Sequence, residues 1–316
     1  MRICATSVDM FFIISGFVLV TVSTGKFQKI GETLHFFYNR ITRVYSLYWF
    51  YTVLLLVYFL LPPEMFSRPR QDINLFKSFL LLPQANMPLL VVAWTLVYEL
   101  YYYFIFGLLL FFAEKHLVKL LLLWAFAVVI GRIFIHDIAN PNLDATMYVM
   151  THPLTLEFII GCIMAKMVFA GTRTMGLVLF IIGILMLPIN HILSVDMAME
   201  GWDRLFFYGL PSTLIVYGAI AAELESNFMF PKFMQTLGDA SYSMYLSHYI
   251  VLPIIGRLWP LVLSQFNLSG EGQIDNIIAS VLMLIASIAA GIISFKLIEN
   301  PMLSFFRKFD IRRVFK

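Results

Sequence analysis

Nine apolar stretches, each long enough to cross a bilayer as a helix, follow one another along this chain of 316 residues. A bilayer core requires about 20 apolar residues per helix. The expected spans lie at about residues 9–24, 44–62, 88–113, 117–136, 150–170, 174–193, 204–222, 241–260 and 275–298. The period-2 alternation of a membrane β-barrel is missing. The sequence therefore predicts an all-α, polytopic transmembrane helix bundle.

The composition supports this fold class. Charged residues make up 13% of the chain and hydrophobic residues 60%, whereas soluble domains have about 25% and 45–50%. So few charges cannot cover a water-soluble surface, which argues against disorder, a coiled coil and a nucleic-acid partner. Two cysteines, Cys4 and Cys162, make neither a disulfide framework nor a metal site. We expect one membrane-embedded domain over residues 1–316, with no metal.

The basic residues are unevenly divided between the two ends of the expected spans. Fourteen lie on one side: Lys26, Lys29, Arg40, Arg43, Lys115, Lys119, Lys166, Arg173, Lys232, Arg307, Lys308, Arg312, Arg313 and Lys316. Seven lie on the other: Arg2, Arg68, Arg70, Lys77, Arg132, Arg204 and Arg257. Because cytoplasmic loops carry the excess of Lys and Arg, the C-terminus is predicted to be cytoplasmic.

With nine spans, a cytoplasmic C-terminus puts the N-terminus outside, although no charge cluster before the first span explains that start. One explanation is a signal peptide formed by Arg2 and the apolar run from Met10 to Val22, although Asp9 and Ser15 interrupt it. The other is a further helix ahead of residue 1. Ten spans with both ends inside would then be self-consistent.

The first expected span contains a carboxylate. Asp9, Phe12 and Gly16 share one helical face, and Gly16 permits close approach of another helix. A charged group inside a span is costly and is by default a functional candidate. The alternative is a solvated Asp9 near a helix N-terminus, where the helix dipole favours negative charge.

Two arginines lie at the edge of the second expected span. Arg40 and Arg43 are three residues apart and so share a helical face. Two guanidinium groups arranged in this way suit the pyrophosphate or 3′-phosphate of a nucleotide carrier. The alternative is that they fix topology and extend to the lipid headgroups.

An aromatic motif opens the third expected span. Trp94 and Tyr98 lie on one face, and Thr95, Glu99 and Tyr103 lie on another. Interfacial belts account for Trp and Tyr, but they do not account for Glu99. A carboxylate one turn inside an apolar span needs a partner, a proton or an aqueous cavity, so Glu99 is a functional candidate.

The fourth motif begins the eighth expected span. Ser241, Tyr245 and His248 fall on one face, and Asp239 or Ser241 can cap the helix. His248, about two turns in, is a titratable group within the membrane. The alternative is a structural histidine whose hydrogen bonds are satisfied.

Together and in this order, these motifs resemble the acyltransferase 3 family of bacterial integral-membrane acyltransferases, which includes O-antigen acetylases and ExoZ-like exopolysaccharide-modifying proteins. The resemblance covers nearly the whole chain. The matching stretches are Val8–Phe17, Arg40-x-x-Arg43-x-Tyr45, Trp94-Thr95-Leu96-x-x-Glu99-x-x-x-Tyr103, Glu157-Phe158-x-x-Gly161 and Ser241-Tyr242-Ser243-x-Tyr245-Leu246-x-His248.

The resemblance implies an enzyme of the bacterial inner membrane that transfers an acyl group, usually acetyl from acetyl-CoA or another acyl-CoA, to a hydroxyl of a cell-surface polysaccharide or lipid-linked glycan. Arg40 and Arg43 are then expected to bind the CoA phosphates. The expected catalytic residues are Asp9, Glu99 and His248, which would orient or assist the histidine of the family's first helix, and His248 is an alternative base. The expected substrate-binding residues are Ser15, Trp94, Tyr98, Ser241 and Tyr242.

The chain departs from the family pattern in one respect. Family members carry in their first helix a basic residue followed eleven positions later by a His, which is the expected base or acyl relay. None of the six His here follows Lys or Arg at that spacing, and the chain starts where the family's second helix starts. We therefore expect ten spans with the family's first helix included, and impaired or absent activity of these 316 residues alone.

Two other functions are compatible with the same fold class. A transporter or flippase of glycan lipids would show inverted repeats and helices broken near the midplane, and neither is clear in the sequence. A non-catalytic membrane scaffold is the other alternative. Acyl transfer distinguishes the enzyme from both.

Overall fold

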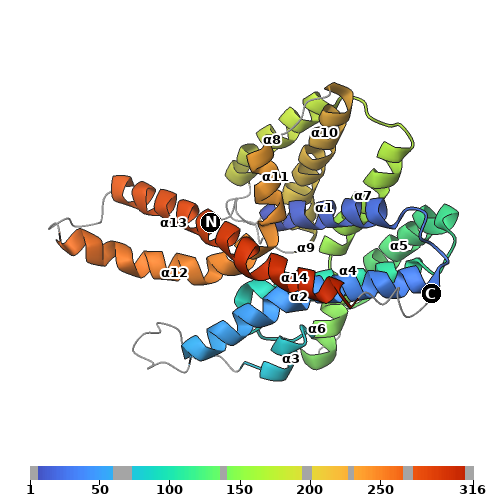
Figure 1. Cartoon of the computed structure of the whole chain (residues 1–316). Helices are drawn as coiled ribbons and strands as arrows, with labels where there is room; N and C mark the ends of the chain where they lie inside the picture. The colour runs from blue at the N-terminus through green and yellow to red at the C-terminus, as the bar shows by residue number, and fades with distance from the viewer. Residues whose placement is uncertain are drawn as a thin grey trace. The chain divides into compact units, whose positions relative to one another are not determined.

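The computed structural model describes residues 6–59, 73–135, 141–193, 201–226, 231–265 and 273–309. Within these ranges, the regular secondary structure is entirely helical, so the all-α prediction is confirmed. The chain forms two compact units: the first unit comprises residues 1–37 and 97–229, and the second unit comprises residues 38–96 and 230–316. Two long helices, α2 (Ile30–Phe59) and α4 (Trp94–Leu109), contribute residues to both units (Figure 1).

Each unit has its own set of helices. Besides parts of α2 and α4, the first unit contains α1 (Thr6–Ser23), η4 (Glu114–His116), α5 (Leu117–Ile135), α6 (Pro141–Met150), α7 (Leu154–Phe169), α8 (Gly176–Leu193), α9 (Gly201–Arg204), η5 (Leu205–Gly209) and α10 (Leu210–Ser226). The second unit contains α3 (Leu75–Phe79), η3 (Val91–Ala93), α11 (Lys232–Asp239), α12 (Ser241–Gln265), α13 (Gln273–Ser294), η6 (Phe295–Glu299) and α14 (Asn300–Arg307). Both η5 and η6 are π-helical turns.

Seven stretches of the described residues are helical, long and apolar enough to cross a membrane. They are Thr6–Ser23, Val91–Leu109, Glu114–Phe134, Ala145–Phe169, Gly201–Glu225, Ser241–Leu263 and Asp275–Arg307. Another expected span corresponds to the shorter apolar helix Gly176–Asn190, and the remaining one overlaps the second half of α2. The prediction of a polytopic helix bundle is confirmed, whereas the cytoplasmic C-terminus and the helix expected ahead of residue 1 stay predictions.

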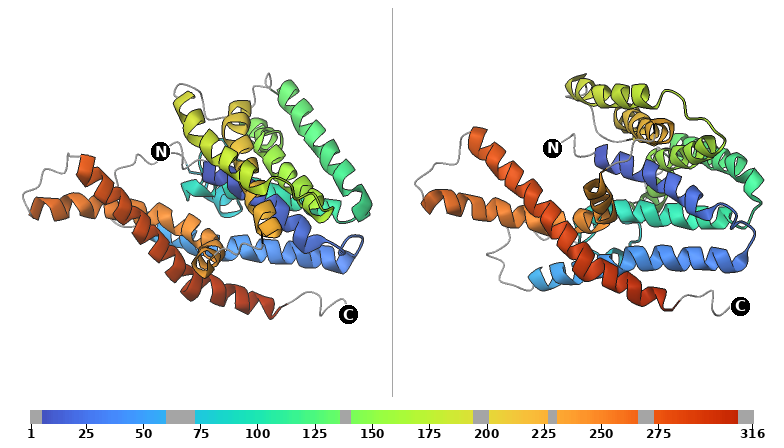
Figure 2. Two further views of the ribbon diagram at one scale, coloured as in Figure 1. Left: turned by 90° about the horizontal axis from the view of Figure 1, so that it is seen from above. Right: turned by 45° about the horizontal axis from the view of Figure 1, so that its top comes forward.

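The first unit is organised around a close contact between α1 and α7, and α8 lies beside α10 (Figure 2). A Cβ built on Gly16 would lie 2.1 Å from the carbonyl oxygen of Phe158, and one built on Gly161 would lie 2.0 Å from that of Ile13. Only glycine fits where the two backbones approach this closely. The close approach predicted at Gly16 is therefore confirmed.

Aromatic side chains fill the interior next to this contact. The ring of Tyr102 stacks on Phe158 with centroids 4.9 Å apart and meets Phe12 edge-on at 5.3 Å. Phe106 and Trp124 pack edge-on against the other sides of Phe158. Because α1, α4, α5 and α7 all contribute to this core, it fixes the position of α1.

In the second unit, α12 and α13 lie side by side (Figures 1 and 2), and polar contacts attach α2 to the C-terminal helices. The hydroxyl of Tyr38 donates to the carbonyl oxygen of Phe306 at 2.8 Å. Further along α2, the hydroxyl of Tyr51 donates to the Ser294 hydroxyl, also at 2.8 Å. These bonds attach α2, on either side of the Arg40–Arg43 segment, to α14 and to the end of α13.

Candidate active site

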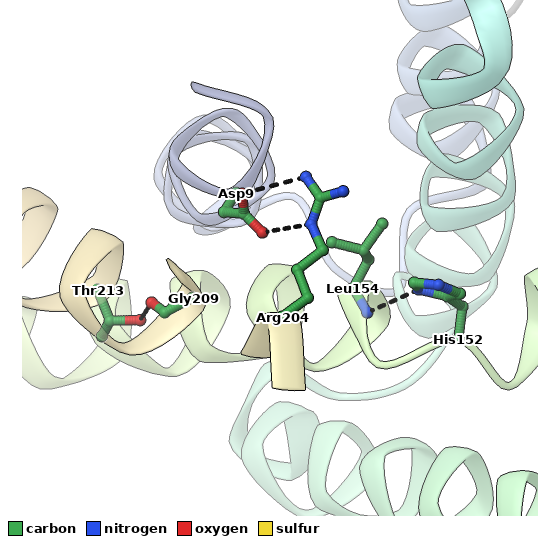
Figure 3. A network of polar contacts seen from close by, with 6 residues as sticks. All are labelled: Asp9, His152, Leu154, Arg204, Gly209 and Thr213. Atoms are coloured by element: carbon green, nitrogen blue, oxygen red, sulfur yellow. Dashed lines mark hydrogen bonds and ion pairs between the residues drawn. The ribbon is translucent and has the colours of Figure 1, made fainter. Parts of the chain in front are cut away.

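Three ionisable side chains of the first unit meet in its interior: Asp9 on α1, Glu157 on α7 and Arg204 on α9. We refer to them as the buried carboxylate cluster. The guanidinium of Arg204 donates two hydrogen bonds to Asp9, from Nε to Oδ1 at 2.8 Å and from Nη2 to Oδ2 at 3.1 Å (Figure 3). The Asp9 side chain is 0% exposed and that of Arg204 is 10% exposed. This two-bond ion pair satisfies both oxygens of Asp9.

Glu157 completes the cluster without a hydrogen bond of its own to the described residues. It is fully buried, and both of its carboxyl oxygens lack a hydrogen-bond partner there. Asp9 and Arg204 both act on it electrostatically. Its Oε1 lies against Gly209, where an added Cβ would come within 2.7 Å, so the last residue of the π-helical turn η5 leaves room for this side chain.

The sequence identified Asp9 as a candidate but did not identify its partner. The alternative of a solvated Asp9 is wrong, because this side chain is fully buried. Arg204 was interpreted only as a topology charge, although it is the first residue of the span expected at 204–222. A buried carboxylate that stays ionised is paired with a cation, and this was the available signal that an arginine or lysine lies near Asp9. Sequence spacing could not select Arg204, which is 195 residues away from Asp9.

Glu99 is also buried in the first unit, and the hydroxyl of Tyr103, one turn later on α4, donates to its Oε1. The sequence placed these two residues on one face, and the structure confirms that they pair. Tyr98 meets the ring of His152 edge-on with centroids 5.3 Å apart. His152 was not among the predicted site residues. Ser15, a predicted substrate-binding residue, is buried on α1.

In the second unit, the start of α12 joins two motifs that are far apart in the sequence. The hydroxyl of Tyr245 lies 2.6 Å from that of Thr95 and donates to the carbonyl oxygen of Val92 at 2.5 Å. His248 is half-buried, with its Nδ1 3.2 Å from the Met244 carbonyl oxygen. The aromatic motif of α4 and the histidine motif of α12 therefore lie in contact.

Two further bonds connect α12 to α2 and to η6. The Tyr242 hydroxyl donates to the carbonyl oxygen of Val44 at 2.8 Å. The Ser243 hydroxyl donates to Oε2 of Glu299 at 2.6 Å, and both groups are buried. Arg43, one residue before Val44, acts electrostatically on Glu299. These contacts bring the arginine motif and the histidine motif together.

The other predicted residues differ in exposure. Arg43 and Ser241 are exposed, whereas Arg40 and Trp94 are half-buried. Exposed and half-buried side chains can contact a dissolved ligand. A ligand could reach a buried side chain such as Asp9 only after the surrounding helices move apart. In the described part of the chain, no group of three or more His, Cys, Asp or Glu is arranged to hold a metal ion.

Ionisable groups placed inside apolar helices of spanning length define a polytopic membrane protein with a polar, functional interior. Sequence comparison makes the class specific: the profile of the acyltransferase domain family, acyltransferase 3, matches residues 2–296. The chain belongs to this family and is an acyltransferase enzyme. The resemblance inferred from the motifs is confirmed.

Two relatives show how far the similarity extends. The exopolysaccharide production protein ExoZ of Rhizobium meliloti is 26% identical over 327 aligned residues, which cover 98% of this chain and 92% of ExoZ. The O-acetyltransferase OatA of Staphylococcus aureus is 22% identical over 339 aligned residues, which cover 93% of this chain and 52% of OatA. No solved structure matches this chain.

Proposed function

We propose that this protein transfers an acyl group, with acetyl as the expected group, from an acyl-CoA to a hydroxyl of a cell-surface polysaccharide or lipid-linked glycan. The observation that carries the proposal is family membership over residues 2–296 together with similarity to ExoZ along nearly the whole chain. The names of the relatives support both parts: one is an exopolysaccharide production protein and the other an O-acetyltransferase. The bacterial inner membrane, with the C-terminus in the cytoplasm, is the proposed location.

The acyl donor is assigned to the second unit. Arg43 is exposed and Arg40 is half-buried on the same helical face, and two guanidinium groups suit the phosphates of CoA. The fourteen basic residues counted on that side of the spans support a donor that arrives from the cytoplasm. The polar groups of Trp94, Ser241 and Tyr242 are the proposed lining for the substrates.

His248 is the proposed general base. It would accept the proton of the acceptor hydroxyl as that oxygen attacks the thioester carbon, and return a proton to the departing CoA thiolate. Both oxygens of Asp9 are bound to Arg204, and Glu99 is bound to Tyr103. These two carboxylates are therefore better suited to hold helices and substrates in position, next to Ser15 and Tyr98, than to exchange protons with the acceptor.

The test is an acyl-transfer assay on membranes containing the protein expressed from its complete gene, with labelled acetyl-CoA and isolated polysaccharide or lipid-linked glycan. Arg40→Ala and Arg43→Ala should raise the KM for the donor by about tenfold or more, and His248→Ala should lower kcat by about a hundredfold. Lys119→Ala, an exposed residue on the same predicted side, is the control. Full activity of Arg40→Ala and Glu99→Gln would refute the assignment, and glycan movement without acyl transfer would favour a transporter.

A further inference from the structure

The buried carboxylate cluster contains two acidic groups and one basic group. Asp9 and Glu157 are fully buried. Arg204 binds both oxygens of Asp9 and so balances one negative charge. An ionised Glu157 would leave this interior with an excess negative charge.

The neighbours of Glu157 offer little to offset that charge. Among the described residues, the groups that act on it electrostatically are the cation of Arg204 and the carboxyl group of Asp9. From α4, Tyr102 interacts with Glu157 and Tyr98 interacts with Arg204. Both tyrosines are uncharged at neutral pH.

Other titratable groups occur on the helices that surround the cluster, among them Asp203 next to Arg204. His152, just before α7, interacts with Arg204 and with Arg132 of α5. The acidic residues of α10, Glu223 and Glu225, are exposed at its far end. The charge of Glu157 is therefore decided mainly by Asp9, Arg204 and burial.

An isolated carboxylate in an apolar interior takes up a proton instead of remaining charged, and two carboxyl groups that share one site retain a proton between them. Two ionised carboxylates cannot hydrogen-bond to each other, so an ionised Glu157 would leave both of its buried oxygens without a partner. A proton on Glu157 turns one of those oxygens into a donor, and the Asp9 carboxylate beside it is the acceptor.

We propose that the buried carboxylate cluster is a proton-binding site, in which Glu157 holds one proton at neutral pH and donates it in a hydrogen bond to Asp9. Glu157 lies one helical turn before Gly161, and Asp9 lies two turns before Gly16, where the α1 and α7 backbones meet. Loss of the proton would set two negative charges against each other at this contact. Glu157 thereby acts as a positioning residue for α1, which carries Ser15.

The direct test is infrared spectroscopy of the purified full-length protein in detergent. A C=O stretching band of a protonated carboxyl should be present at neutral pH, should be lost in Glu157→Gln, and should remain in the matched control Glu223→Gln. If the band is unchanged in Glu157→Gln, Glu157 is ionised and the proposal is overturned. Glu157→Met, which is neutral and of similar length, is the second variant if Glu157→Gln does not fold.

A second measurement rests on the proposed function and follows acyl transfer across pH. The amide of Glu157→Gln donates a hydrogen bond at every pH, so the activity ratio of this variant to the wild type should rise as the pH becomes alkaline. A ratio that stays constant with pH would contradict the positioning role. The infrared band needs no acyl donor: a Glu157 band in a protein without transferase activity would overturn the proposed function and leave the proton site standing.

Discussion

Each unit has a buried carboxylate at a π-helical turn, but the two carboxylates have different partners. In the first unit, Asp9 binds Arg204, the residue that directly precedes η5. In the second unit, Glu299 is the last residue of η6 and accepts a hydrogen bond from Ser243. Both carboxylates are buried, but one has an ionic partner and the other a neutral hydroxyl. π-Helical turns in longer helices frequently mark functional sites. In the first unit Asp9 is thus held by an ion pair, whereas in the second unit Glu299 is held by a hydrogen bond from a neutral side chain.

Two spans that carry these buried glutamates, one in each unit, differ in how much of their length is buried. Within the protein, 67% of the apolar stretch of Ala145–Phe169 is buried, compared with 11% for Asp275–Arg307. The first of these helices carries Glu157 and contacts α1, and the second carries Glu299. We therefore expect substitutions in the first unit to act mainly on stability and those in the second unit to act mainly on ligand binding.

The largest effect is expected from Arg204→Gln, which removes the cation from the buried pair. Breaking a buried ion pair by deleting one partner costs about 3–5 kcal/mol. Chemical unfolding of the purified protein in detergent measures this loss. The double variant Asp9→Asn with Arg204→Gln should be more stable than Arg204→Gln alone, because no uncompensated charge remains. Equal stability of the two would show that the charges do not interact.

Adding a methyl group at the glycine contact between α1 and α7 should have the next largest effect on stability. Gly161→Ala places a methyl group against the Ile13 backbone, and overpacking of this kind costs about 1–3 kcal/mol. Gly31→Ala on α2 is the control, since an added Cβ there meets nothing within 4 Å. That variant should gain about 0.5–1 kcal/mol in helix stability. Similar unfolding curves for the two variants would argue against a tight helix contact.

Ser243→Ala should have a smaller effect in the second unit. It removes the hydroxyl that donates to Glu299, and a buried acceptor left unsatisfied costs about 1–3 kcal/mol. Ser280→Ala is the matched control, because that exposed hydroxyl only donates to the Asn276 carbonyl oxygen one turn earlier. Thermal unfolding of both variants should separate them, and an equally small change in both would mean that Glu299 does not depend on Ser243.

Arg43→Ala should change stability least and ligand binding most. Arg43 is exposed, and interactions of exposed charges contribute about 0–1 kcal/mol, so the unfolding midpoint should hardly move. Titration with acyl-CoA should nevertheless show weaker binding, with the largest difference at low ionic strength because salt screens exposed charges. A large loss of stability with unchanged donor binding would reverse the expected division between the units.

The sequence predicted those features of the fold and site that depend on local periodicity. Helical spacing placed Asp9, Phe12 and Gly16 on one face, and all three are buried in the structure. It also placed Tyr103 on the face of Glu99, one turn later. In both cases the relevant neighbours lie within two helical turns, where spacing alone determines which residues meet.

Contacts between distant segments could not be predicted in this way. Nothing in the spacing connects Asp9 with Arg204, Thr95 with Tyr245, or Ser243 with Glu299, because tertiary packing decides which helices become neighbours. The expected span at about residues 174–193 corresponds to α8, which ends at Leu193 as predicted. The single domain expected over residues 1–316 and the roles assigned to the site residues stay predictions.

The separation of 195 residues between Asp9 and Arg204 also has a consequence for biosynthesis. At about 5–20 residues per second, Arg204 is made roughly 10–40 s after Asp9. During that interval the helix that carries Asp9 has no Arg204 to bind. A carboxylic acid can take up a proton and enter the bilayer uncharged, whereas a guanidinium stays charged. Asp9, which can be neutralised by a proton, is therefore synthesised first. Arg204, which stays charged, is synthesised when Asp9 is already available to bind it.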